Sequence, residues 1–181
     1  RLFSVAQTGD SRHRVVVADG ADMSQVFEDE TFDTLLNIHV LEHVVDPVAM
    51  VRECSRVLKK GGTAVFLIPQ TASVHHAPEV YYNFTRYWGE RVLPKCGLEL
   101  VSVQPLGGLW TTIASRMFFF FFQAAGEPTR GHPDVRRSPW FYLLFPVMAI
   151  YAIVSIPFLM ILGLGDLHEE ANNHLYVAKK S

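Results

Sequence analysis

The chain has 181 residues, of which 49% are hydrophobic and 19% are charged, and its formal net charge at pH 7 is −2. This composition supplies a core and excludes general disorder, and the near-neutral charge argues against a dedicated nucleic-acid binder. Two cysteines, Cys54 and Cys96, are too few for a disulfide framework and favour a reducing, cytoplasmic setting. Because the chain begins with Arg1 rather than methionine and shows no signal-peptide pattern, we expect a fragment whose beginning is missing.

Short apolar runs and helix-like stretches alternate over the first half of the chain. Helix Pro47–Leu58 is predicted because Pro47 suits a first helical position and Lys59-Lys60-Gly61 suits a helix end, and a weaker helical pattern covers Tyr87–Cys96. Strands are predicted where apolar runs stop at turn-forming or polar residues, over Arg14–Ala18, Phe32–Ile38, Gly62–Ile68 and Leu98–Val103. This alternation predicts an α/β fold with a parallel sheet.

The second half of the chain is much more apolar. Gly107–Ala125 has a single charge, at Arg116, and Pro139–Gly165 has none; a polar connector lies between these two segments. The last residues, His174–Lys180, again look like a strand. We therefore divide the chain into a first portion over 1–104, a hydrophobic helical insert over 105–170, and a strand over 171–181 that returns to the sheet.

Polar residues follow the expected strands. Asp19-Gly20-Ala21-Asp22 comes after the first, and Asn37-Ile38-His39 comes after the second. Ligands of such sheets bind beyond the carboxyl ends of the strands. An acidic side chain beside a glycine can accept hydrogen bonds from an exocyclic amine or a ribose hydroxyl, while nearby backbone N–H groups stay available.

Four sequence blocks stand in order between Val15 and Val103. They are Asp19 to Asp22, Phe27 to Asp33, Val40 to Pro47 and Arg56 to Gly62. Together they resemble class I S-adenosylmethionine-dependent methyltransferases, within the methyltransferase type 11 group. The resemblance implies a Rossmann-like sheet whose last strand is antiparallel, and S-adenosylmethionine as cofactor. The cofactor-binding candidates that it implies are Asp19, Gly20, Ala21, Asp22, Asn37, Ile38 and His39.

The family opens with a strand and a glycine-rich turn that holds the methionine end of the cofactor, and neither occurs before Val15. If Arg14–Ala18 is the family's third strand, the first two strands lie upstream of Arg1. The chain would then hold half of the cofactor pocket, and we expect it to be inactive by itself.

Methyl transfer needs alignment of the reacting atoms and, for some acceptors, removal of a proton. His43 and His39 are the candidate bases, because imidazole titrates near neutral pH; the alternative is that both pack the loop before the helix. His39, Glu42 and His43 also have the spacing of a divalent-metal set, similar to one in ubiquinone-pathway O-methyltransferases, although local pairing of Glu42 is the simpler interpretation, so we assign no metal.

The stretch from His75 to Tyr87 resembles the segment that follows the fifth strand in many bacterial members of the family. Within it, Tyr82 and Arg86 are our candidates for binding the methyl acceptor. The aromatic residues of this stretch can equally serve as packing between a loop and a helix.

The apolar run Trp140–Leu164 is long enough to cross a bilayer. A single crossing would separate His174–Lys180 from the sheet, so we expect Gly107–Ala125 and Trp140–Leu164 to form a hairpin in the cytoplasmic leaflet, with Pro146 and Pro157 interrupting its second helix. The alternative is a hydrophobic lid on the sheet or on another subunit.

We therefore predict S-adenosylmethionine-dependent methyl transfer to a small or lipid-linked acceptor, at the inner face of a membrane and without nucleic acid. Two other hypotheses remain. One is a non-catalytic membrane-associated scaffold built on a degenerate methyltransferase sheet, and the other is a dinucleotide-dependent oxidoreductase, since both enzyme classes use related sheets.

Overall fold

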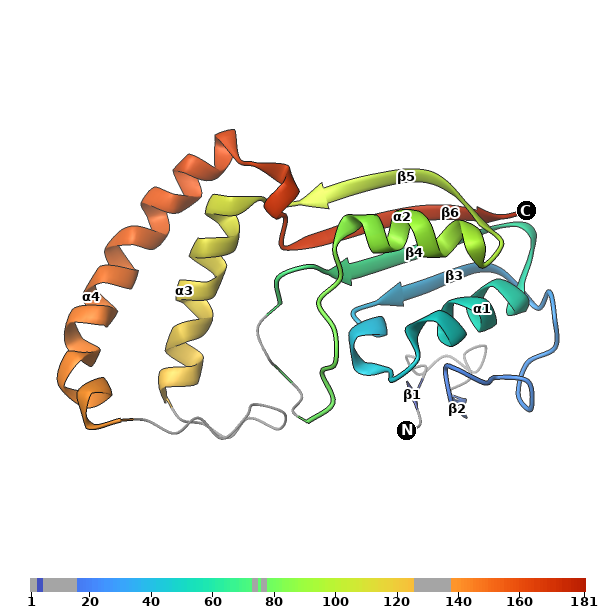
Figure 1. Ribbon diagram of the computed structural model, residues 1–181, viewed down its shortest axis with the longest axis horizontal. Coiled ribbons are helices and arrows are strands. Elements are labelled where there is room, and N and C mark those ends of the chain that lie inside the picture. Colours follow the sequence, from blue (N-terminus) through green and yellow to red (C-terminus); the bar gives the residue numbers. More distant parts are fainter. Residues whose placement is uncertain (1–2, 5–15, 73–74, 76–77, 126–137) are drawn as a thin grey trace, which may run out of the picture. The chain divides into compact units, whose positions relative to one another are not determined.

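The structure is a computed structural model that describes residues 3–4, 16–72, 75, 78–125 and 138–181. It divides into two units (Figure 1). The first contains residues 1–68, 84–103 and 175–181, and the second contains residues 69–83 and 104–174.

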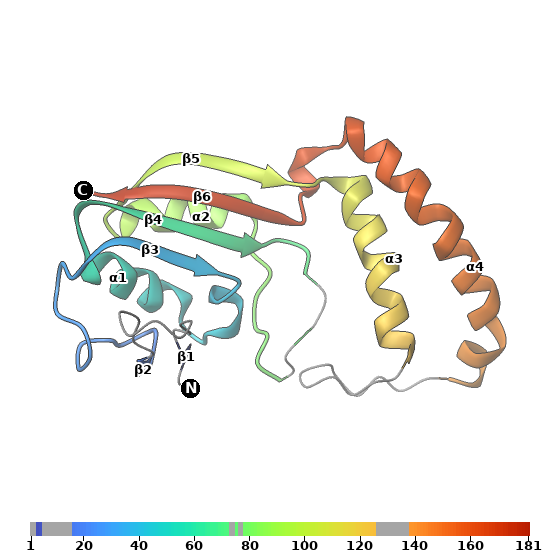
Figure 2. The ribbon, with the colours of Figure 1, turned by 180° about the vertical axis from the view of Figure 1, so that it is seen from behind.

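A four-stranded sheet forms the centre of the first unit, with the order β3-β4-β6-β5. Its strands are β3 (Phe32–Ile38), β4 (Leu58–Pro69), β5 (Leu98–Leu106) and β6 (Asn173–Lys180). Strands β3 and β4 are parallel, whereas β6 runs opposite to its neighbours β4 and β5 (Figures 1 and 2). The α/β class and the antiparallel last strand are thereby confirmed.

Two helices cover one face of this sheet, α1 (Pro47–Val57) and α2 (Arg86–Lys95) (Figures 1 and 2). Helix α1 starts where the sequence predicts, because the Asp46 carboxylate accepts a hydrogen bond from the Ala49 N–H at 2.9 Å. The helix buries an apolar stripe against the sheet. The core consists of Leu41, Val44, Met50, Val51, Cys54, Leu58, Ala64, Phe66, Ile68, Phe84, Leu93, Leu98, Tyr176 and Ala178.

The junction between α1 and β4 is tighter than expected. The helix ends at Val57 and the strand begins at Leu58, so Lys59 and Lys60 belong to the strand and not to a helix end. The ladder with β3 is irregular at this point, since Phe32 pairs with Leu58 while Thr34 pairs with Thr63. Gly61 has a φ of 72°, a conformation that glycine adopts without strain and that this bulge requires.

The prediction of a parallel strand over Arg14–Ala18 is wrong for the residues of this range that the structure describes. Strand β2 (Val17–Ala18) pairs antiparallel with β1 (Phe3–Ser4) in a separate two-stranded sheet, and the Val17 side chain is 50% exposed. Three consecutive valines specify extended backbone but not the partner. A nearby antiparallel partner needs a shorter loop than a crossover to a parallel strand, which favours this local pairing.

The second unit holds two helices, α3 (Leu109–Ala125) and α4 (Pro139–Leu162), which form a hairpin (Figure 1). Phe120 of α3 contacts the rings of Phe141 and Phe145, at centroid distances of 6.3 and 6.1 Å. The prediction that prolines interrupt the second helix is wrong, because α4 continues through Pro146 and Pro157. A proline removes one backbone hydrogen bond of the helix, and the remaining hydrogen bonds of a helix of this length keep the helix continuous.

A single carboxylate ties the two ends of the hairpin together. Asp166 follows η2 (Gly163–Gly165) and accepts hydrogen bonds from the backbone N–H groups of Trp110 at 2.7 Å and Thr111 at 3.0 Å. The Thr111 hydroxyl donates a further bond at 2.7 Å. These N–H groups belong to the first turn of α3, which has no intrahelical acceptors, so Asp166 caps α3 from a distant part of the chain.

Candidate functional site

One residue of the loop after β2 and one residue near the end of β3 both approach Met50 of α1. Gly20 is buried, and a Cβ at this position would lie 2.7 Å from the Cε of Met50. Asn37, on β3, has its Nδ2 3.9 Å from the Sδ of the same methionine. Gly20 and Asn37 therefore both lie next to the side chain of Met50.

The two aspartates of the first loop differ in what they bind. One carboxylate oxygen of Asp19 accepts the Ala21 N–H at 2.9 Å, and the side chain is exposed. Asp22 instead accepts both the backbone N–H and the hydroxyl of Ser24, at 3.1 and 2.6 Å. These bonds from Ser24 lower the pKa of Asp22. Asp22 therefore stabilises the turn, which leaves Asp19 as the better placed of the two to accept a bond from a ligand.

An ion-pair network fixes the segment that follows this loop. Glu53 on α1 accepts the Met23 N–H at 2.7 Å, and its two carboxylate oxygens accept bonds at 2.8 Å from the Nε and Nη2 groups of Arg56. Arg56 also donates to the carbonyl of Phe27 at 3.0 Å and to Asp29 at 2.7 Å. Hydrogen bonds to Glu53 and Asp29 raise the pKa of Arg56. Our sequence interpretation missed this role, although a Glu and an Arg three residues apart on a helix are a signal for such a pair.

The end of β3 presents one buried amide and one exposed apolar side chain. The Asn37 side chain is buried, and its Oδ1 has no hydrogen-bond partner among the described residues. Ile38 is 51% exposed. His39 follows with a φ of 51°, a left-handed conformation that is uncommon for a residue with a side chain and is often found at functional sites.

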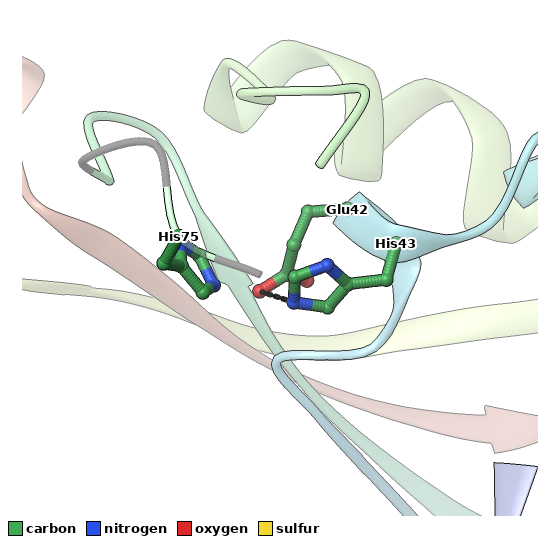
Figure 3. Close-up of side chains that lie close together, drawn as sticks. All are labelled: Glu42, His43 and His75. Carbon is green, nitrogen blue, oxygen red and sulfur yellow. Dashed lines mark ion pairs between the residues drawn. The ribbon is translucent and has the colours of Figure 1, made fainter. Parts of the chain in front are cut away.

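Glu42 lies in η1 (Leu41–His43) and is enclosed by protein, with a side chain that is 1% exposed. Its Oε1 lies 3.3 Å from the Nδ1 of His39 and 3.8 Å from the Nε2 of His43, the contact drawn in Figure 3. Neither carboxylate oxygen has a hydrogen-bond partner within the described part of the chain. A buried carboxylate is costly without a cationic or proton-donating neighbour, and the two imidazoles are the groups in position to serve.

His39, Glu42 and His43 thus come together, although His39 lies before the helical turn η1, in a left-handed conformation, and not on the turn itself. They offer a carboxylate between two imidazoles, which can hold a proton or orient one imidazole toward an acceptor. The nitrogen and oxygen donors also suit a divalent cation in kind, but the contacts are those of a carboxylate with its neighbours. His75, which Figure 3 also labels, belongs to the second unit, and its neighbour His76 lies outside the described residues.

The two acceptor-binding candidates have other contacts. Arg86 donates to Glu90 at 3.1 Å on α2, and its guanidinium lies 5.6 Å from the centre of the Tyr87 ring. Tyr82, in the second unit, forms an edge-to-face pair with Tyr81 at 6.4 Å. Phe84 and Trp88 pack at 4.4 Å, and Phe84 is buried in the core. The packing interpretation therefore holds for Phe84.

Comparison with known proteins identifies the first part of the chain. Residues 3–66 match the model of a family described as "Methyltransferase domain". Over 33 residues the chain is 52% identical to a ubiquinone biosynthesis O-methyltransferase of Parvibaculum lavamentivorans, a match that covers 18% of this chain and 13% of that protein. Residues 3–66 are thus similar to the methyltransferase domains of the class I S-adenosylmethionine-dependent enzymes. The cofactor of this family is S-adenosylmethionine.

Solved structures share the fold over most of the chain. A methyltransferase from Archaeoglobus fulgidus has a TM-score of 0.52 at 14% identity, covering 95% of this chain and 70% of that one. The [4+2]-cyclase SpnF has a TM-score of 0.50 at 15% identity, covering 90% of this chain and 54% of that one. The chain thus spans about half the length of the cyclase. One of these relatives is named for a reaction other than methylation, so the shared fold does not decide the reaction.

The described residues fit one side of a methyltransferase cofactor pocket. Asn37 has a buried carbonyl oxygen that needs a donor, and Gly20 keeps the backbone of the loop close to α1. Asp19 would accept from the adenine amine of S-adenosylmethionine, with Gly20 and Ala21 offering backbone groups and Ile38 an apolar surface. When bound, the cofactor supplies a methyl group on a positively charged sulfur.

Proposed function

We propose that the protein containing this chain transfers a methyl group from S-adenosylmethionine to a small or lipid-linked acceptor. The observation that carries the proposal is the convergence of Gly20 and Asn37 on Met50, inside the segment that matches the methyltransferase domain. Asp19 and its loop bind the adenine side of the cofactor. Ile38 and His39 line the path toward the sugar and the sulfur.

The histidines supply the acid–base part of this proposal. A nucleophilic oxygen loses a proton as it attacks the methyl carbon, and a neutral imidazole is suited to receive that proton near neutral pH. His39 is the more exposed of the two imidazoles, at 39%, and His43 is at 13%. Glu42 then stabilises whichever imidazole carries the proton. Tyr82 and Arg86 are kept as candidates for contacting the acceptor.

Calorimetry with S-adenosylmethionine and with NAD tests this function. The complete protein, as its reading frame encodes it, is expected to bind S-adenosylmethionine, and Asp19→Asn is expected to weaken binding about tenfold by removing a charge-assisted bond. Glu99→Gln, which neutralises an exposed acidic residue of β5, is the matched control and should bind as the wild type does. Binding of NAD alone would overturn the proposal in favour of an oxidoreductase, and binding of neither ligand would favour the non-catalytic scaffold.

We also propose that the 181-residue chain alone transfers no methyl group. The support is its sequence, which shows no glycine-rich turn ahead of the Asp19 loop to hold the methionine end of the cofactor. A methyl-transfer assay that compares the 181-residue chain with the complete protein tests this point. Turnover by the short chain would refute it.

Membrane attachment at the inner face is the remaining part of the proposal. Pro139–Gly165 is the one helical segment among the described residues that is long and apolar enough to cross a membrane, with a mean hydropathy of 2.4. Most of its large apolar side chains are exposed, among them Leu143, Val147, Ile150 and Val154. Exposed apolar surface of this extent favours an apolar environment. Replacing residues 140–164 by a short polar loop should release the protein from liposomes, and unchanged flotation would contradict the attachment.

A further inference from the structure

The hairpin of the second unit has a largely open cavity of about 430 Å³ on its surface, lined by residues of both α3 and α4. This volume lies within the range of small-molecule sites, roughly 300–1,000 Å³. The residues that line the cavity are Thr112, Ile113, Arg116, Met117, Phe120, Met148, Tyr151 and Ala152.

The lining residues occupy one face of each helix. On α3 they recur at the spacing of successive turns, and on α4 they include Met148, Tyr151 and Ala152, at three and four residues apart. Ala152 is 3% exposed, so its small side chain lies at the base of the cavity, where the two helices pack closely. Walls of methionine, phenylalanine and aliphatic groups suit a flexible hydrocarbon chain, because methionine adapts its shape to the contact.

Arg116 is an exposed charged residue among those that line the cavity. It is the one charged residue in the sequences of α3 and α4, and it lies on the cavity wall. Its guanidinium donates to the Ala72 carbonyl at 3.0 Å, which fixes the arginine beside the cavity. A guanidinium carries five N–H donors in a planar fork that matches the oxygens of a phosphate.

We propose that this cavity binds one acyl chain of an anionic membrane phospholipid, with the lipid phosphate at Arg116. Two observations select this occupant. The lone cation on an apolar wall complements an anionic headgroup joined to a hydrocarbon chain, and the outer side chains of α4 beside the cavity are apolar and exposed, as contact with a bilayer requires. The inference rests on the membrane attachment proposed above, and it specifies a lipid site that attachment alone does not require.

The test uses the full chain on liposomes of phosphatidylcholine, with or without phosphatidylglycerol that carries a photo-crosslinking acyl chain. The wild type should float with the liposomes and cross-link through α3 and α4. Ala152→Phe, which fills the cavity, should reduce cross-linking at least tenfold without changing flotation. Ile153→Phe adds the same bulk at the neighbouring, exposed position and should cross-link as the wild type does. Met117→Trp is a second cavity-filling variant, and circular dichroism checks the helix content of each.

The headgroup part is tested by native mass spectrometry of lipids retained by the chain. The wild type should retain phosphatidylglycerol over phosphatidylcholine, and Arg116→Gln should reduce that preference about tenfold, the effect of one charge-assisted hydrogen bond. Arg116→Lys should keep part of the preference. Arg91→Gln removes an equal charge from α2 and is the matched control, expected to leave the preference unchanged.

The outcomes separate the two proposals. A wild type that does not float would overturn membrane attachment and this inference with it. A wild type that floats, but cross-links equally in Ala152→Phe and Ile153→Phe, would leave attachment standing and overturn the lipid site. Retention of palmitate in place of phospholipid would overturn the assignment of a membrane lipid as the occupant.

Discussion

Gly89 of α2 lies against Tyr176 of β6 so closely that a methyl group has no room. A Cβ at position 89 would lie 2.5 Å from the Cζ of Tyr176 and 2.9 Å from its hydroxyl oxygen. Tyr176 cannot easily move away, because its side chain is 1% exposed and its hydroxyl donates to the Arg86 carbonyl at 3.0 Å. Overpacking of this kind costs about 1–3 kcal/mol, and loss of the hydroxyl bond costs about 1 kcal/mol more. The better helix propensity of alanine offsets about 1 kcal/mol.

Gly89→Ala is therefore expected to lower the free energy of unfolding by about 1–3 kcal/mol, which corresponds to a fall in melting temperature of roughly 2–12 °C for a chain of this size. Urea unfolding followed by the fluorescence of the neighbouring Trp88 measures it. Gly165→Ala is the control, since a Cβ there meets no atom within 4 Å. Tyr176→Leu should make the Gly89 substitution less costly in the double variant. Equal stability of Gly89→Ala and the wild type would refute the steric reasoning.

Three further predictions concern titratable groups. Burial raises the pKa of Cys54 to about 12, so a thiol reagent at pH 8 should label the partly exposed Cys96 first, and faster labelling of Cys54 would contradict its burial. Burial opposes ionisation of Asp166, but bonds from the first turn of α3 lower its pKa to about 2. Because this pKa is depressed from about 3.9, the stabilisation should be full above about pH 4 and lost as pH falls through 2. Asp166→Ala should thus cost about 0.5–2 kcal/mol at pH 7 but little near pH 2, and a pH-independent difference in urea unfolding would argue against the cap. Glu42→Gln should leave the free energy of unfolding at pH 7–8 within about 1 kcal/mol of the wild type or raise it, because neither carboxylate oxygen accepts a hydrogen bond from the described residues. A loss of several kcal/mol would contradict this reasoning.

Elements with a strong local signal could be predicted from the sequence. Strand β3 has the predicted bounds, and α1 starts at the predicted residue, because an apolar run or a proline after an aspartate determines local conformation directly. Three valines at 15–17 do not choose between a parallel and an antiparallel partner. The predicted parallel pairing of β2 was therefore wrong, because the partner of a strand depends on which other segments lie nearby and not on the residues of the strand alone.

The candidate site was predictable in its residue types and not in its contacts. The spacing of His39, Glu42 and His43 predicted that they share a face, and both imidazoles do approach one carboxylate oxygen. The hydrogen bonds that Ser24 donates to Asp22 could not be predicted from the sequence, which indicated both Asp19 and Asp22 as candidates. Asp166 caps α3 through hydrogen bonds to residues more than fifty positions away in the chain, and a local sequence pattern cannot predict such bonds.

The place of β6 in the sheet has a consequence for biosynthesis. This strand leaves the ribosome after both apolar helices, yet it pairs between β4 and β5. Until it arrives, those two strands have open edges and the first unit cannot close. The sheet of the first unit therefore forms only after the last strand of the chain has been made.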